Sequence, residues 1–275
     1  MSATVMVPLD GSPAAEAALP WAIRLALRSG GSVRLVGVHA PPAIVLDGEF
    51  GVGAVIPDEP IREKEVAYFT DVQARLRSSQ VPTSADVLDG GVVSSLAEYG
   101  ANLRPTWIVM LSHVRGTLGR FFRGETATEF LRRSPCPVLL VRETDTSADA
   151  KNVLIPLDGS PVAEHMVGPA TQFAQTLGAD VTLLTAVADA KLLDAESYLG
   201  RHAAIIRAGG INVQSRVVRE GHAADAILAA ATAGTVIALA THGRGGLSKL
   251  VWGSVTDQVI HRATAPVLVY KPSEE

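Results

Sequence analysis

The sequence predicts an α/β fold made of two tandem domains, each with an open five-stranded parallel sheet. Three observations predict it: short apolar runs alternate with helical segments, two motifs occur twice, and the composition can fill sizeable cores. Of the 275 residues, 47% are hydrophobic and 19% are charged, which is enough for one or two cores. Only 5% are aromatic, so Val, Leu, Ala and Ile must fill these cores.

The internal repeat sets the domain organisation. Residues 7–13 return as residues 155–161 with the shared string Pro-Leu-Asp-Gly-Ser-Pro, and residues 135–141 align with residues 264–270. The offset falls from 148 to 129 residues, so the first half is about 19 residues longer. We assign the extra residues to 41–60 and expect a long loop there. Two roles stay open for this loop, a lid and an interface arm. The expected domains are 1–145 and 146–275, joined by a polar stretch.

The apolar runs predict five strands in each half. In the first half they lie near 4–8, 32–38, 82–88, 107–111 and 138–141. In the second half they lie near 152–157, 181–187, 211–219, 236–240 and 267–270. Helices are expected between the strands of the second half, at 161–177, 191–208, 222–232 and 254–262. Strands that alternate with helices favour a parallel sheet covered on both faces.

Charge and composition argue against several classes of protein. The net charge is −4 with no basic face, so we expect no nucleic-acid binding. Cys136 is the only cysteine, and the N-terminus lacks the pattern of a signal peptide. No apolar run reaches about 18 residues, so a cytoplasmic protein without a membrane segment is expected. The histidines lack metal-ligand spacing, and no metal site is expected.

A glycine-rich segment, 241–246, follows the apolar run 236–240 and precedes a helix that Ser254 is suited to cap. Glycines let a ligand approach the backbone, and a helix N-terminus attracts anions. Strand, loop and helix together predict a phosphate cradle. Taken alone, glycine clusters are most often plain turns, and a Gly-Ser pair before a helix is usually only a cap.

The string Thr241-His242-Gly243-Arg244-Gly245-Gly246-Leu247, with nine residues between Gly243 and Gly253-Ser254-Val255, resembles the nucleotide-binding signature of the universal stress protein family. That signature is Gly-x-x-Gly, nine residues, then Gly-Ser or Gly-Thr, and the chain departs from it at Ala240. The resemblance covers nearly the whole chain, because each half resembles one domain of the family. It implies adenine nucleotide alpha hydrolase-like domains with strand order 3-2-1-4-5. It also implies a pseudo-dimer that packs through the edge strands 138–141 and 267–270.

By this resemblance the second half would bind ATP, with or without Mg²⁺, and the chain would act as a sensor or regulator in a stress response. Asp158 would face the ribose, and Pro156 and Ala186 would border the adenine. The residues that would surround the phosphates are Ala240, His242, Gly243, Arg244, Gly253, Ser254, Val255 and Thr256. Asp158 also fits an Asx turn that leads into a helix, and His242, repeated as His113, also fits a structural role.

The first half lacks the residues of the cradle. Leu111 and Val114 occupy both early glycine positions, and Glu125 stands where Ser or Thr would meet a phosphate. A carboxylate there would occupy the anion site and repel a phosphate. We therefore expect the first half to bind ATP weakly or not at all. An anion contact through the three arginines between 115 and 123 stays open as an alternative.

Two other functions stay open. One is a slow ATP hydrolase that uses the same crevice, for which Asp158 is the only tempting carboxylate and no catalytic residue is assigned. The other is a nucleotide-free scaffold that binds an unknown protein partner. A homodimer of the two-domain chain is compatible with each of these functions.

Overall fold

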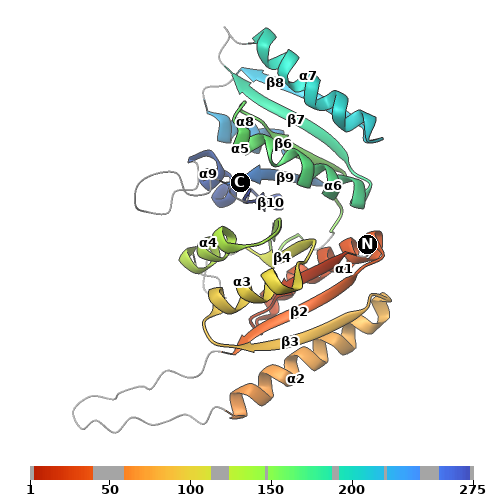
Figure 1. The fold of residues 1–275 in the computed structure, drawn as a ribbon, viewed down its shortest axis with the longest axis vertical. Helices are drawn as coiled ribbons and strands as arrows, with labels where there is room; N and C mark the ends of the chain where they lie inside the picture. Colours follow the sequence, from red (N-terminus) through yellow and green to blue (C-terminus); the bar gives the residue numbers. More distant parts are fainter. Residues whose placement is uncertain are drawn as a thin grey trace, which may run out of the picture.

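The computed structural model describes residues 3–39, 59–112, 124–145, 148–187, 192–219, 222–241 and 254–272. The strands form one ten-stranded sheet in the order β3-β2-β1-β4-β5-β10-β9-β6-β7-β8, with the second half above the first in Figure 1. Numbered within each half, both runs have the order 3-2-1-4-5. The α/β prediction is confirmed, and each predicted strand lies within two residues of an observed one.

The first half alternates strands with helices along the chain. Its elements are β1 (Thr4–Pro8), the 3-10 helix η1 (Pro13–Ala18), α1 (Leu19–Ser29), β2 (Ser32–His39), α2 (Glu59–Leu76), η2 (Arg77–Ser79), β3 (Thr83–Asp89), α3 (Val92–Leu103), β4 (Trp107–Leu111), α4 (Gly124–Arg133) and β5 (Val138–Val141).

The second half repeats the same succession. Its elements are β6 (Asn152–Pro156), α5 (Pro161–Glu164), α6 (Val167–Leu177), β7 (Asp180–Val187), α7 (Leu192–Ala208), β8 (Val213–Arg219), α8 (Ala223–Ala230), β9 (Thr235–Ala240), α9 (Ser254–Arg262) and β10 (Val267–Tyr270).

The predicted helix over 161–177 is wrong as a single element. Ser160 caps its start as expected, since its Oγ accepts a hydrogen bond from the Ala163 amide at 3.2 Å. The helix then breaks between α5 and α6, at His165 and Met166. Pro169 explains the break, because it has no N–H to donate to the carbonyl of His165 and its ring would clash there. The helix predicted over 222–232 is also shorter, ending at Ala230.

Two apolar cores lie on the two faces of the sheet. Helices α1, α2, α6 and α7 cover one face, and α3, α4, α8 and α9 cover the other. The first core includes side chains from both halves. Within it, the rings of Trp107 in β4 and Phe173 in α6 pack edge to face, with centroids 6.3 Å apart. Each half therefore completes the core of the other.

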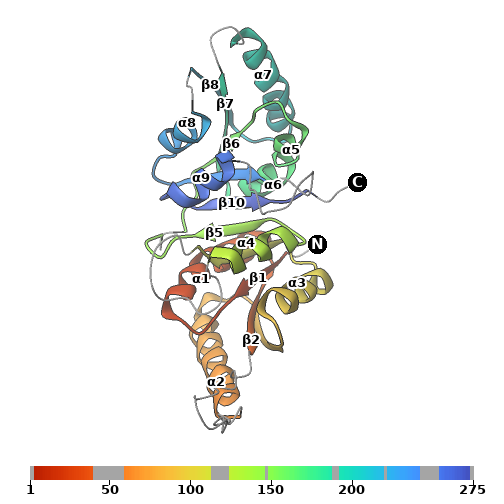
Figure 2. The same ribbon diagram turned by 90° about the vertical axis from the view of Figure 1, so that its left-hand side faces the viewer.

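The antiparallel pairing of β5 with β10 joins the halves. Leu139 lies opposite Leu268, with Val138 and Leu140 paired on either side of it. Figure 2 shows the two strands side by side across the middle of the molecule. All four residues of β5 are buried. The expected packing of the two halves through these edge strands is confirmed.

Arg142, directly after β5, makes a second link between the halves. Its Nε donates to the Ala263 carbonyl at 3.1 Å and its Nη2 to the Ile260 carbonyl at 2.5 Å, both at the C-terminal end of α9. Its Nη1 donates to the Ser112 hydroxyl at 3.0 Å, at the end of β4. A cation is favourable at a helix C-terminus, so the first half stabilises a helix of the second.

We predict that Arg142→Met lowers the free energy of unfolding by about 1–3 kcal/mol, because it leaves half-buried carbonyls without donors. Urea unfolding measures the change. The control is Arg132→Met, which removes an exposed ion pair with Glu129 and should cost about 0.5 kcal/mol or less. Equal losses in the two variants would contradict a special role for Arg142.

Candidate functional site

The sheet of the second half reverses its strand order between β6 and β9. These strands are parallel neighbours, from Asn152 opposite Thr235 to Leu154 opposite Ile237. The chain passes from β6 to β7 on one side and returns through β9 on the other. Ligands of open α/β sheets bind beyond the carboxyl ends of the strands at such a reversal. We call this region, where the chain leaves β6 and β9, the β6–β9 edge.

Asp158 lies at this edge, two residues after β6, and is exposed. Its Oδ1 accepts a hydrogen bond from the Ser160 amide at 2.9 Å, which forms the Asx turn that the sequence left open. Its Oδ2 has no hydrogen-bond partner within the described residues. The turn thus fixes the Asp158 carboxylate at this edge.

Pro156 and Ala186 lie on neighbouring strands at the same edge. Pro156 pairs with Leu184 of β7, and Ala186 is two residues further along that strand. Both side chains are partly exposed. The Thr185 hydroxyl donates to the Leu157 carbonyl at 2.7 Å and fixes the two strand ends against each other.

The first turn of α9 reaches the same edge. The Thr256 hydroxyl donates to the carbonyl of Ala240 at 3.4 Å, and the Thr241 amide donates to the Tyr270 carbonyl at 2.9 Å. Ser254, the first residue of α9, is exposed. The amides of a first helical turn lack partners within the helix and can bind an anion.

The other predicted contacts divide into two groups. Val255, in the first turn of α9, is half-buried beside Ser254. His242, Gly243, Arg244 and Gly253 lie outside the described residues.

Three side chains at this edge were missed by the sequence analysis: Glu164, Tyr198 and His202. Burial, together with the nearby carboxylates of Glu164 and Asp158, raises the pKa of Tyr198. The Tyr198 hydroxyl is buried and faces the Glu164 carboxylate and the Gly159 backbone, short of full hydrogen-bond geometry. His202 packs edge to face on Tyr198, and its Nε2 lies 3.6 Å from Glu164 Oε1. A tyrosine and a carboxylate thus stand beside the candidate ribose-facing residue.

The internal repeat carries a signal that could have found Glu164 and Tyr198. Glu16 aligns with Glu164 at the same offset that relates Asp10 to Asp158. Burial and the nearby carboxylates of Glu16 and Asp10 also raise the pKa of Tyr68, in α2. Both halves therefore place an Asp, a Glu and a Tyr at the end of their first strand.

The described part of the chain offers neither a metal site nor a membrane span. No group of three or more His, Cys, Asp or Glu side chains is placed there to hold a metal ion. Among the helices described, none combines the length and the apolar character of a membrane span. Cys136 is buried, and burial raises the pKa of its thiol to about 12.

Known proteins match the chain over nearly its whole length. The model of the universal stress protein family matches residues 1–142 and 150–271. A universal stress protein of Mycolicibacterium smegmatis is 26% identical over 289 residues, covering 98% of this chain and 97% of that protein. One of Mycobacterium tuberculosis strain H37Rv is 25% identical over 302 residues, covering 98% and 96%. The crystal structure of a universal stress protein from Archaeoglobus fulgidus has a TM-score of 0.79 at 20% identity and covers 99% of this chain and 100% of its own, which shows a shared fold.

The two Asx turns give a matched test of structural against ligand-facing roles. Asp10 is 8% exposed, and its Oδ1 accepts from the Ser12 amide and hydroxyl, whereas Asp158 is exposed and accepts from one amide. We expect Asp10→Ala to lower the free energy of unfolding by about 1–3 kcal/mol and Asp158→Ala by less than about 1 kcal/mol. Urea unfolding without nucleotide tests this. A larger loss at Asp158 would show that its main role is structural.

Proposed function

The chain belongs to the universal stress protein family, and from this premise we propose that its second half binds ATP at the β6–β9 edge, as a sensor or regulator in a stress response. The observation that carries the proposal is the contact of Thr256 with Ala240, which brings the first turn of α9 to the end of β9. A phosphate at this place would meet unpaired backbone amides, the Ser254 hydroxyl and the positive end of the helix dipole.

The nucleoside would lie on the β6 side of this edge. The Oδ2 of Asp158, which has no hydrogen-bond partner in the described part of the chain, would accept a hydrogen bond from a ribose hydroxyl. Pro156 and Ala186 would border the adenine, since both are partly exposed on neighbouring strands. Tyr198 would close the ribose side, since its hydroxyl lies near the carboxylates of Glu164 and Asp158.

The phosphate loop completes the proposed site. Arg244 would add charge-assisted hydrogen bonds to the phosphates, and His242, Gly243 and Gly253 would shape the loop around them. Mg²⁺ would accompany the phosphates. The first half, with Val114 in place of a glycine, would bind ATP weakly or not at all, which divides the chain into unlike domains at about residue 145.

Calorimetric titration of ATP and Mg²⁺ into nucleotide-free protein tests the proposal. We expect one site per chain, and at least a tenfold weaker affinity in Gly243→Asp, because a carboxylate in the loop would repel the phosphates. The matched control is Val114→Asp, the same change at the aligned position of the first half, which should leave the affinity unchanged.

Three outcomes would contradict the proposal. They are no binding at millimolar ATP, two equivalent sites per chain, or equal loss in Gly243→Asp and Val114→Asp. Phosphate release from bound ATP that Asp158→Asn abolishes would instead establish the hydrolase.

A further inference from the structure

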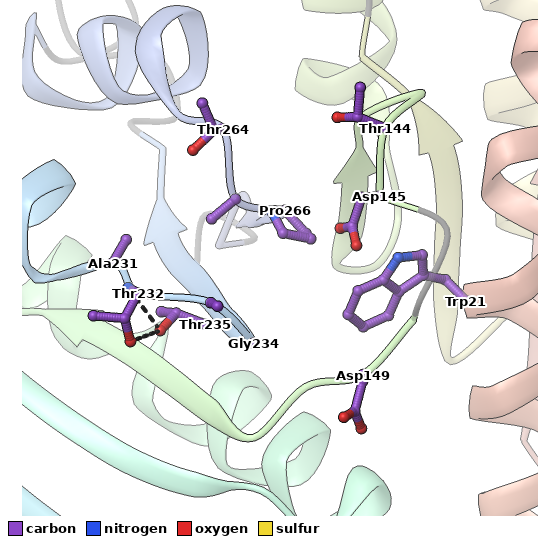
Figure 3. A pocket seen from close by; sticks show the side chains of 12 residues that line it. Trp21, Thr144, Asp145, Asp149, Ala231, Thr232, Gly234, Thr235, Thr264 and Pro266 are labelled. Atoms are coloured by element: carbon purple, nitrogen blue, oxygen red, sulfur yellow. Dashed lines mark hydrogen bonds between the residues drawn. The ribbon is translucent and has the colours of Figure 1, made fainter.

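A cavity of about 380 Å³ lies between the two halves (Figure 3). Its first-half wall consists of Trp21 in α1 and of Thr144 and Asp145 beyond β5. Its second-half wall consists of residues 231–235, which lead into β9, and 264–266, which lead into β10. The cavity therefore borders the amino ends of β9 and β10, at the opposite end of β9 from the β6–β9 edge.

The walls of this cavity are held in place. The linker between the halves is packed into the core, since Ala148 is 3% exposed. Asp149 of the linker accepts a hydrogen bond from Arg24 Nη2 at 2.8 Å, which ties it to α1. On the other side, the Thr232 amide donates to Thr235 Oγ1 at 3.2 Å. A ligand would thus find a formed site.

The cavity carries an uncompensated negative charge. The charged side chains in its lining are both carboxylates, Asp145 and Asp149. Arg24 neutralises Asp149, whereas Asp145 has no ion-pair partner among the described residues. Burial raises the pKa of Asp145, and the neighbouring indole of Trp21 lowers it in part. A half-buried carboxylate without a counter-charge gains from a bound cation.

The wall behind Asp145 also has unsatisfied hydrogen-bonding groups. Trp21 is 1% exposed, and its Nε1 makes no hydrogen bond within standard geometry. Asp145 Oδ2 is buried beside this N–H, which lowers the pKa of the carboxyl although the pair falls short of full hydrogen-bond geometry. Figure 3 shows the indole N–H on the side of the ring that faces Asp145. A cation in the cavity would pair with the Asp145 carboxylate beside this N–H.

We propose that this cavity binds a small organic ammonium ion, a primary amine on a short chain. An ammonium group has three donors, which suit the Asp145 carboxylate and the hydroxyls of Thr144 and Thr264. The small side chains of Ala231 and Ala233 leave space for the aliphatic part. Phosphates and carboxylates are disfavoured by the charge of Asp145. Because the walls come from both halves, the bound amine stabilises their packing.

Calorimetric titration with n-butylamine, which is cationic at neutral pH, tests the proposal, with n-butanol as a neutral probe of similar length. We expect saturable binding of one butylammonium per chain and at least a tenfold weaker affinity for butanol. Asp145→Asn keeps the shape of the side chain and removes its charge. It should weaken the binding of butylammonium at least tenfold. The control Asp225→Asn removes an exposed carboxylate paired with Arg262 and should leave the affinity for butylammonium unchanged.

A second variant tests the cavity without altering its charge. Ala233→Phe, at an exposed position of the lining, should fill the space and abolish binding, with an unchanged unfolding transition as proof that the protein is folded. Gly243→Asp should bind butylammonium normally, so failure of the ATP proposal would leave this one standing. No saturable binding, equal binding of butanol, or full binding in Asp145→Asn would overturn the amine site.

Discussion

The antiparallel pairing of β5 with β10 is the constraint on which the rest of the structure depends. Without it, each half would end in an apolar edge strand whose outward-facing backbone donors and acceptors lack partners in the sheet. With it, the ten strands form one sheet, and an apolar core on each face continues from one half into the other. The contact of Trp107 with Phe173 and the packing of α1 against α6 follow from this junction.

The same pairing decides which ends of the two sheets meet. Because β5 and β10 are antiparallel, the carboxyl ends of the first half's strands lie beside the amino ends of the second half's strands. Arg142, leaving β5, therefore meets the end of α9 just before β10 begins. Asp145, three residues later, comes to face residues 264–266 across the cavity. The antiparallel pairing of β5 with β10 thus accounts for both the contacts of Arg142 with α9 and the cavity beside Asp145.

The sequence predicted what depends on local pattern and on repetition. Apolar runs located the strands because buried parallel strands are apolar throughout, and the repeated Asp-Gly-Ser-Pro located both Asx turns. The break at His165 had a local signal in Pro169, which the helical pattern outweighed. The contacts of Arg142 had none, since they join residues about 120 positions apart and a single arginine after a strand has many possible partners.

Helix α9 links the proposed phosphate site to the junction between the two halves. Its first turn contacts Ala240 at the proposed phosphate site, and its last carbonyls accept hydrogen bonds from Arg142, which also holds Ser112 at the end of β4. The two ends of this nine-residue helix thus contact the proposed phosphate site and the first half. A nucleotide changes the conformation only if it prefers one position of α9. The first half supports α9 through Arg142, directly after β5. This support does not involve the first-half segment that lacks the phosphate-binding glycines, so it does not require the first half to bind a nucleotide.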